Sequence, residues 1–262
     1  MRVLIKGAGD LASGIACRLH AAGFSVMMTE IAQPTTIRKT VAFSQAVYDK
    51  TTCVEGIEGV LVDSIEEMEA ALQQRKIPVR IDPQLADKGI YHADVLVDAV
   101  LAKHNTGTTI QDAALVIGVG PGFTAGVDCH AVIESKRGHF LGRVITEGAA
   151  IPNTGVPGNI EGYSIQRLVR ASAEGIFHPA AQIGDFVKAG QTVAYCDQTP
   201  VYAQMDGMVR GMLQEGLPVY PNMKCGDIDP RCDRKLIDTV SDKARAIGGG
   251  VLEVIVAKMM AQ

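Results

Sequence analysis

The first thirty residues place the tightest limits on the fold. Val3 to Ile5 form a short apolar strand pattern, and a loop of small residues follows at 7–14. A helical stretch then continues to about Ala22, where Gly23 stops it. A second strand pattern, Ser25 to Thr29, leads directly into Glu30. The sequence therefore begins strand, glycine loop, helix, strand and acid.

This order of elements is the layout of a dinucleotide-binding fold. In such folds, small residues let the backbone approach a pyrophosphate at a helix N-terminus, and a carboxylate about twenty residues later holds a ribose. We therefore predict a Rossmann-like domain with a bound nucleotide. The residues expected to hold it are Gly7, Gly9, Gly14 and Glu30. The alternative is that the glycines serve only tight packing of the helix on the strand.

Strand and helix patterns continue to alternate as far as residue 118. Strands are predicted at 59–62, 78–81, 94–97 and 115–118, and Ser64 is expected to cap an acidic amphipathic helix. Strands separated by helical segments indicate a parallel sheet. We expect this sheet to end at 115–118, so the Rossmann-like nucleotide-binding domain is predicted over residues 1–118.

The segment after Glu30 is predicted to begin another helix, over Ile31 to Lys39. Arg38 and Lys39 would then stand near the proposed ribose. Two interpretations stay open: the pair favours a 2′-phosphate, or it belongs to a solvated helix face.

Residues 119–262 change to short alternating segments, which predicts a β-rich domain. Its stretch from Leu168 to Val219 resembles a barrel-sandwich module of the biotinyl/lipoyl type. The hairpin Asp197 to Pro200 lacks the lysine of carrier proteins, so the likeness covers the scaffold alone. The segment 151–159 is predicted to be a long loop. A C-terminal helix begins at about Ser241, and three glycines inside it, each costing about 1 kcal/mol relative to alanine, require close packing or a break.

Composition excludes several classes of function. The chain has 262 residues, of which 47% are hydrophobic, enough for well-packed cores. A net charge of −4 without clustered Lys and Arg argues against nucleic acid as a partner. No apolar run reaches the roughly 18 residues of a membrane span, and the N-terminus is no signal peptide, so we expect a cytoplasmic protein. The six cysteines show no CxxC pair and are expected to be mostly reduced.

A second glycine-rich stretch, Gly118 to Glu134, combines backbone amides with reactive side chains. As a strand or as a helix, it brings His130 and Glu134 together. Such a pair could bind a metal or form a base with its orienting acid. The alternative is a hydrogen-bonded structural histidine on a half-exposed strand, which an isolated His–Glu pair favours. Cys129 is a candidate nucleophile only if it is exposed and its pKa is lowered; otherwise it is a core cysteine. The predicted catalytic residues are Asp128, Cys129 and His130, beside amides of Gly120, Gly122 and Gly126 that would face an anion.

A further polar group lies near the C-terminus. Pro230 favours an extended conformation at Asp229, so Asp227, Asp229 and Arg231 are expected to point the same way. They form either a ligand-binding site or a surface ion pair in a turn.

Several of these segments together strongly resemble the YqeB-type family, whose members are called selenium-dependent molybdenum hydroxylase system proteins. The segments are 6–14, 29–34, 118–134, 137–145, 152–155 and 226–231. The resemblance runs nearly end to end. It implies an accessory protein that assists maturation of a molybdenum hydroxylase and binds that enzyme or its cofactor.

The ligand expected from these arguments is NAD(P) or the nucleotide of a molybdenum cofactor. Two other classes remain open: an NAD(P)-dependent oxidoreductase, and a non-catalytic docking or carrier protein. The sequence leaves open the metal content, whether the protein is an enzyme, and whether it forms a homo-oligomer.

Overall fold

The computed structural model describes residues 1–86, 88–155 and 157–261, and these divide into two compact units. Unit 1 comprises Met1–Pro34, Val41–Thr154 and Val240–Gln262, and unit 2 comprises Thr35–Thr40 and Gly155–Thr239. The predicted domain boundary at residue 118 therefore lies inside unit 1. The segment predicted to be a loop over 151–159 includes residue 156, which lies outside the described residues.

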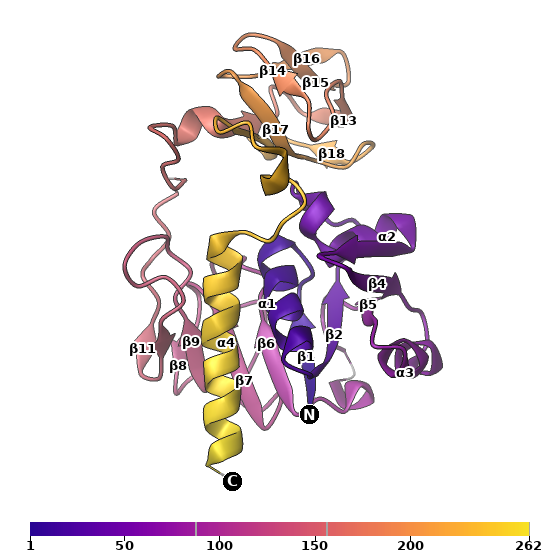
Figure 1. The fold of residues 1–262 in the computed structure, drawn as a ribbon, viewed down its shortest axis with the longest axis vertical. Helices are drawn as coiled ribbons and strands as arrows, with labels where there is room; N and C mark the ends of the chain where they lie inside the picture. Colours follow the sequence, from indigo (N-terminus) through magenta and orange to yellow (C-terminus); the bar gives the residue numbers. More distant parts are fainter. Residues whose placement is uncertain (87, 156, 262) are drawn as a thin grey trace. The chain divides into compact units, whose positions relative to one another are not determined.

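Unit 1 is built on a nine-stranded sheet of order β10-β9-β7-β6-β1-β2-β5-β4-β3 (Figure 1). All neighbouring strands are parallel except β3 with β4 and β9 with β10. The strands are β1 (Arg2–Lys6), β2 (Ser25–Glu30), β3 (Thr51–Val54), β4 (Ile57–Leu61), β5 (Ile77–Ile81), β6 (Val95–Asp98), β7 (Leu115–Val119), β9 (Ala131–Ile133) and β10 (Val144–Ile145). A separate pair consists of β8 (Thr124–Ala125) and β11 (Gly148–Ala149).

Apolar side chains alternate across this sheet and give it a core on each face. In β1, Val3 and Ile5 join the core that includes α1 (Asp10–Ala21) and α4 (Asp242–Met260), whereas Leu4 joins the core on the opposite face. Strands covered on both faces are near-continuous apolar runs. This explains why the central strands were recognisable in the sequence.

Capping residues set where the longer helices begin. Ser64 accepts a hydrogen bond from Glu67 N at 3.1 Å and starts α3 (Ile65–Gln73), as predicted. Ser241 accepts from Ala244 N at 3.2 Å and starts α4. The remaining helical segments are α2 (Ala46–Asp49) and the 3₁₀ turns η1 (Lys39–Val41), η2 (Phe43–Gln45), η3 (Lys88–Tyr91), η4 (Ile165–Arg167) and η5 (Arg234–Leu236).

Helices α1 and α4 lie side by side on one face of the sheet (Figure 1). A Cβ on Gly14 of α1 would lie 2.5 Å from Ala244 Cβ, and one on Gly250 of α4 would lie 2.3 Å from Gly142 O. A Cβ on Gly249 would meet nothing within 4 Å. Gly250 of α4 thus permits close packing, as the sequence led us to expect, whereas Gly249 faces open space.

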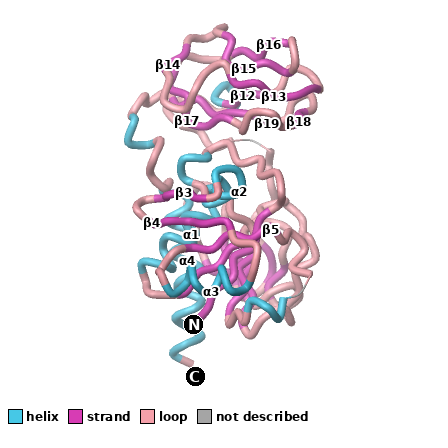
Figure 2. Tube along the Cα trace, turned by 90° about the vertical axis from the view of Figure 1, so that its right-hand side faces the viewer, coloured by secondary structure: helices cyan, strands magenta, loops and turns pink. Residues whose placement is uncertain are grey.

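Unit 2 contains two four-stranded sheets, of orders β12-β19-β17-β14 and β16-β15-β13-β18, and can be followed in Figure 2. All its strand pairs are antiparallel. The strands are β12 (Leu168–Arg170), β13 (Gly175–Pro179), β14 (Phe186–Val187), β15 (Thr192–Cys196), β16 (Thr199–Tyr202), β17 (Gly207–Met212), β18 (Pro218–Val219) and β19 (Lys224–Asp229). One apolar core, which includes Phe177, Val209 and Ile228, fills this unit.

The predicted Rossmann-like parallel sheet is wrong. The sheet is mixed, and it continues beyond residue 118 into β9 and β10. Between β5 and β6 the described residues contain only the 3₁₀ turn η3, and between β6 and β7 they contain no helix. A doubly wound sheet is covered by helices of its own crossovers. Here α4, from the far end of the chain, covers part of one face instead.

The predicted biotinyl/lipoyl-type module is also wrong. Unit 2 includes the distant segment Thr35–Thr40, where Ile37 O accepts a hydrogen bond from Met212 N at 2.8 Å. Short alternating segments specify strands but leave their partners open. The predicted helix over Ile31 to Lys39 is likewise absent. Its second half belongs instead to the segment Thr35–Thr40, which packs as part of unit 2.

Candidate functional site

The glycine loop after β1 lies at the carboxyl end of the parallel strands of unit 1. Gly7 has a φ of +94°, and a Cβ there would lie 3.2 Å from the carbonyl group of Ala99. Gly9 is the N-cap of α1 and provides no side-chain hydrogen bond to its first turn. Backbone N–H groups at a helix N-terminus attract anions. Gly7 N itself donates to Thr29 O at 2.9 Å. The groups that favour an anionic ligand are therefore the amides at the start of α1.

Glu30 at the end of β2 contacts this loop directly. Its Oε2 accepts a hydrogen bond from Ala8 N at 2.9 Å, and its Oε1 accepts from Ile31 N at 2.8 Å. Burial raises the pKa of Glu30 above its usual value, although these two hydrogen bonds act in the opposite direction. Each carboxylate oxygen can accept more than one hydrogen bond. Glu30 thus keeps acceptor capacity for a ligand hydroxyl.

Gly14, predicted to bind the same ligand, has a different role. It packs α1 against Ala244 of helix α4, as described above, and not against a strand as the packing alternative had it. Arg38 belongs to unit 2, where its Nη2 donates to the carbonyl oxygens of Leu236 and Thr239, each at 3.1 Å. The structure therefore gives no support to a 2′-phosphate contact by Arg38.

A buried ionic cluster, which the sequence analysis missed, lies where β1 and β6 end. Lys6 Nζ is 3.5 Å from Asp98 Oδ2, and their side chains are only 4% and 1% exposed. Lys6 Nζ also donates to Thr106 Oγ1 at 2.9 Å, and Thr108 Oγ1 donates to Asp98 at 2.6 Å. The signal in the sequence was a charged residue directly after each of two apolar strand patterns.

This cluster anchors the loop between β6 and β7. Two non-glycine residues in the loop, Leu101 and Lys103, have φ of 57° and 70°. Such conformations are costly and persist where the surrounding structure imposes them, often at functional sites. The loop also packs its His104 backbone against Gly122, where a Cβ would lie 2.7 Å from His104 Cα. Lys103 is therefore presented in an imposed conformation.

Lys103 and Lys243, in the first turn of α4, form a positively charged pair. Burial lowers the pKa of Lys103. Burial also lowers the pKa of Lys243, and the charge of Lys103 lowers it further, whereas Asp10 acts to raise it. Neither ammonium has an ion pair or hydrogen bond within residues 1–86, 88–155 and 157–261. Two ammonium groups that repel each other near the start of α1 favour an anion between them.

The stretch Gly118 to Glu134 forms neither one continuous strand nor a helix after its glycines. Its residues instead form β8, a turn and the short β9. Cys129 is fully buried in the core, and burial raises its pKa to about 11. Cys129 thus meets neither condition for a nucleophile.

The side chains next to Cys129 serve the loop itself. Asp128 Oδ2 accepts a hydrogen bond from Thr124 N at 2.8 Å, and His130 Nδ1 accepts from Val116 N at 3.0 Å. Glu134 does not meet His130: its carboxylate accepts from Lys136 N at 2.7 Å and from Ile151 N at 2.8 Å. Within the part of the chain that the structure describes, no group of three or more His, Cys, Asp or Glu side chains could hold a metal.

The glycines of the central loop differ in their surroundings. Gly120, Gly122 and Gly126 have φ of +78°, +114° and +84°. A Cβ on Gly120 would lie 2.4 Å from Ser135 Oγ, whereas one on Gly126 would meet nothing within 4 Å. Gly120 N donates to Ile133 O at 2.8 Å and Gly126 N to Cys129 O at 2.8 Å, so these two amides are occupied by the loop's own carbonyls. An anion site made of all three amides stays a prediction.

We expect a thiol reagent at neutral pH to modify Cys53 in the folded protein and to leave Cys129 unmodified. Cys53 is exposed, whereas Cys129 has no accessible surface and a raised pKa, and alkylation requires an accessible thiolate. Peptide mass spectrometry after iodoacetamide treatment measures both sites. Denatured protein, in which both cysteines react, is the control. Comparable modification of the two in the folded state would contradict this placement.

The polar group predicted near the C-terminus, Asp227, Asp229 and Arg231, lies in unit 2, on β19 and just beyond it. Arg231 donates to Asp229 through Nε at 2.9 Å and Nη2 at 2.6 Å. Burial raises the pKa of Asp229, but the hydrogen bonds and charge of Arg231 outweigh it, and the pKa lies below its usual value. Asp227 accepts from Arg167 Nη2 at 3.0 Å. The structure thus brings Asp227, Asp229 and Arg231 into one ionic cluster, as expected, but in a different unit from the glycine loop.

The mixed sheet and its charged carboxyl edge define an α/β protein with a candidate anion-binding site. The chain is 50% identical over 257 residues to the uncharacterized protein YqeB of Escherichia coli strain K12. The alignment covers 98% of this chain and 48% of YqeB, so the chain spans about half the length of the curated relative it matches. This identity supports the resemblance to the YqeB family. No protein-family profile matches the chain.

Solved structures offer only a distant likeness. An aspartoacylase family protein from Mesorhizobium loti covers 87% of this chain at 10% identity, with a TM-score of 0.27, and 84% of that protein is matched. A succinylglutamate desuccinylase/aspartoacylase from Rhodobacter sphaeroides matches at 14% identity and a TM-score of 0.28, again over 87% of this chain and 84% of that one. TM-scores this low carry no argument about activity.

These solved structures are of aspartoacylase and desuccinylase proteins, and a likeness this distant carries no argument about the fold of this chain. The relative YqeB is itself uncharacterized, so the selenium-dependent and molybdenum-related role implied by the resemblance receives no support from it. None of the helices that the structure describes is long and apolar enough to cross a membrane.

Proposed function

We propose that unit 1 binds a nucleotide-type anion at the carboxyl edge of its parallel strands. The observation that carries this proposal is the pair Lys103 and Lys243, two ammonium groups near the start of α1 that form no ion pair or hydrogen bond within the described residues, although Asp10 and Glu134 act on Lys243 from a distance. Ligands of open α/β sheets bind outside the carboxyl ends of the strands. A phosphate group there would meet helix amides and both ammonium groups.

Two further groups at this edge suit the sugar of a nucleotide. Glu30 keeps acceptor capacity, as described above. Thr29, the register partner of Lys6 on the neighbouring strand, has a buried hydroxyl that finds no hydrogen-bond partner among the residues that the structure describes. A buried polar group left without a partner is destabilising, so a ligand or water that paired with it would stabilise the site. The ligand class is therefore a phosphate with an attached polyhydroxyl group.

Within this class, we propose NAD(P) or the nucleotide of a molybdenum cofactor as the ligand. The YqeB resemblance supports an accessory protein that holds a cofactor for a molybdenum hydroxylase. Mass spectrometry of small molecules that co-purify with the chain would identify the ligand. Affinity purification from cells that make such a hydroxylase would test the partner, and its absence from the purified material would count against this role.

The double variant Lys103→Gln/Lys243→Gln is expected to bind nucleotides at least about tenfold more weakly, because hydrogen bonds to charged groups contribute about 1.5–3 kcal/mol each. Calorimetric titration of the whole chain with NAD⁺, NADP⁺ and ADP at low salt measures the affinities. Weakening common to all three would indicate a phosphate contact. Glu30→Gln is expected to weaken binding of the same ligands through the ribose.

Lys258→Gln is the matched control, since Lys258 is exposed near the C-terminal end of the same helix α4. It is expected to keep the affinity of the original chain. The proposal is refuted if none of the three nucleotides binds saturably, or if the double variant binds as tightly as the Lys258→Gln control.

A further inference from the structure

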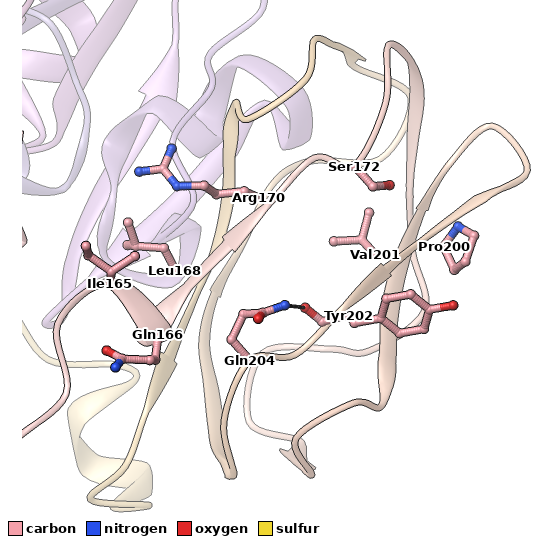
Figure 3. A pocket seen from close by; sticks show the side chains of 9 residues that line it. All are labelled: Ile165, Gln166, Leu168, Arg170, Ser172, Pro200, Val201, Tyr202 and Gln204. Atoms are coloured by element: carbon pink, nitrogen blue, oxygen red, sulfur yellow. Dashed lines mark hydrogen bonds between the residues drawn. The ribbon is translucent and has the colours of Figure 1, made fainter.

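A pocket of about 550 Å³ opens in unit 2, along the edge strands β12 and β16 (Figure 3). Small-molecule sites typically have volumes of about 300–1,000 Å³, so the pocket is large enough for a ligand with a ring or a short branched chain. None of the residues considered so far as functional lines it. It is therefore separate from the glycine loop and from the ionic cluster of β19.

The pocket exists because two sheet edges lie next to each other without pairing. Strand β12 ends one sheet of unit 2, with β19 as its neighbour, and β16 ends the other, with β15 as its neighbour. The two edge strands are in contact. Side chains of a strand alternate between its faces. Leu168 and Arg170 from β12, and Pro200 and Tyr202 from β16, are among the residues that line the pocket. In Figure 3 the Arg170 guanidinium and the Tyr202 ring lie on opposite sides of it.

The walls of the pocket are largely apolar and uncovered. Ile165, on the 3₁₀ turn η4, is 59% exposed, and Tyr202 is 48% exposed. Val201 contributes from the apolar core beneath. Exposed apolar surface that gathers around a hollow is typical of ligand sites, whereas singly exposed apolar residues need no explanation. The body of a ligand here would be aromatic or aliphatic.

Among the described residues that line the pocket, Arg170 is the only charged one, and none carries a carboxylate. Its Nη1 donates to Asn222 O at 2.7 Å, which orients the guanidinium from one side. A guanidinium has five N–H donors, so others remain for a ligand. Gln166, Ser172 and Gln204 add neutral polar groups to the lining. This lining attracts an anion and lacks a group that would hold a cation.

We propose that the pocket binds a small organic anion, with its apolar body between η4 and β16 and its carboxylate or phosphate facing Arg170. Planar guanidinium groups pair with both kinds of anion. This site is independent of the nucleotide proposed for unit 1, and either can fail without the other.

Ligand-observed NMR titration of the whole chain tests the pocket with three probes of similar size: phenylacetate, phenyl phosphate and the neutral phenylacetamide. Saturable binding of at least one anion, at least tenfold tighter than the amide, is expected. The stronger anion shows whether the site prefers a carboxylate or a phosphate. Arg170→Gln is expected to weaken the binding of that anion by about tenfold, because the variant loses a charged hydrogen-bond partner.

Two variants make the result specific to this pocket. Arg234→Gln, which removes an exposed arginine elsewhere in unit 2, is expected to leave binding unchanged. Gln204→Trp places a large side chain in the lining at an exposed position and is expected to abolish binding while the circular dichroism spectrum stays the same. The proposal is overturned if no anion binds saturably, if the amide binds as tightly as the anions, or if Arg170→Gln binds like the original chain.

Discussion

Replacing Asp227 with alanine is expected to lower the free energy of unfolding of unit 2 by about 3–5 kcal/mol, the usual cost of removing one partner from a buried ion pair. Asp227 is 6% exposed at its side chain and accepts from Arg167 Nη2 at 3.0 Å, and Arg167 is 7% exposed. Arg210 Nη1 lies 3.5 Å from the other carboxylate oxygen. The variant would leave these two guanidinium groups buried with less compensating charge.

Hydrogen exchange of peptides from β17 and β19, followed through a urea titration, measures this loss within unit 2. Asp206→Ala is the control, because it removes an ion pair with Lys188 in which both side chains are more than half exposed. Exposed pairs contribute little to stability. Equal losses in the two variants would show that the ionic cluster of β19 is no more important to the fold than a surface pair.

Two neighbouring glycines of α4 are expected to respond to alanine in opposite directions. Gly250→Ala should destabilise unit 1 by about 1–3 kcal/mol, the usual cost of overpacking, because its Cβ would lie 2.3 Å from the backbone oxygen of Gly142. Gly249→Ala should stabilise the same unit by about 0.5–1 kcal/mol, because its Cβ meets nothing within 4 Å and alanine favours a helix.

Thermal and urea unfolding, monitored by the helical circular dichroism signal, compares the two variants. Each is the control for the other, since they make the same chemical change one residue apart in the same helix. If Gly250→Ala were as stable as Gly249→Ala, α4 would not pack against Gly142 as described here.

Much of unit 1 was predictable because its strands are buried on both faces. The apolar runs at β1, β2, β6 and β7 and the Ser64 cap gave the right elements. Pairing was harder to predict, because the edge strands β3 and β10 run antiparallel and α4 comes from the far end of the chain. These features depend on long-range contacts that local periodicity does not specify.

The sequence predicted the local backbone around the candidate site better than the burial of its side chains. Glu30 contacts the glycine loop through Ala8 N, because a strand end and a loop follow directly from the sequence. That these residues bind a nucleotide stays a prediction. The reactive role predicted for Cys129 found no support, and Lys103 was not predicted at all, because the exposure of a side chain depends on which segments pack over it. A thiol after a glycine loop appeared reactive but is a core residue. A lysine in an unremarkable loop became one of two unpaired charges at the candidate site.

The path of the chain through unit 1 also affects its synthesis. Its sheet is complete by β10, but α4, which covers α1, begins only at Asp242. Gly155–Thr239 of unit 2 lie between β10 and α4 in the sequence, so they leave the ribosome before α4 does. Chains fold as they are made, with N-terminal parts first. A nascent chain would thus leave the apolar side of α1 that packs on α4 exposed until Asp242–Met260 have been made, and unit 1 would reach its native state only after unit 2 has been synthesised.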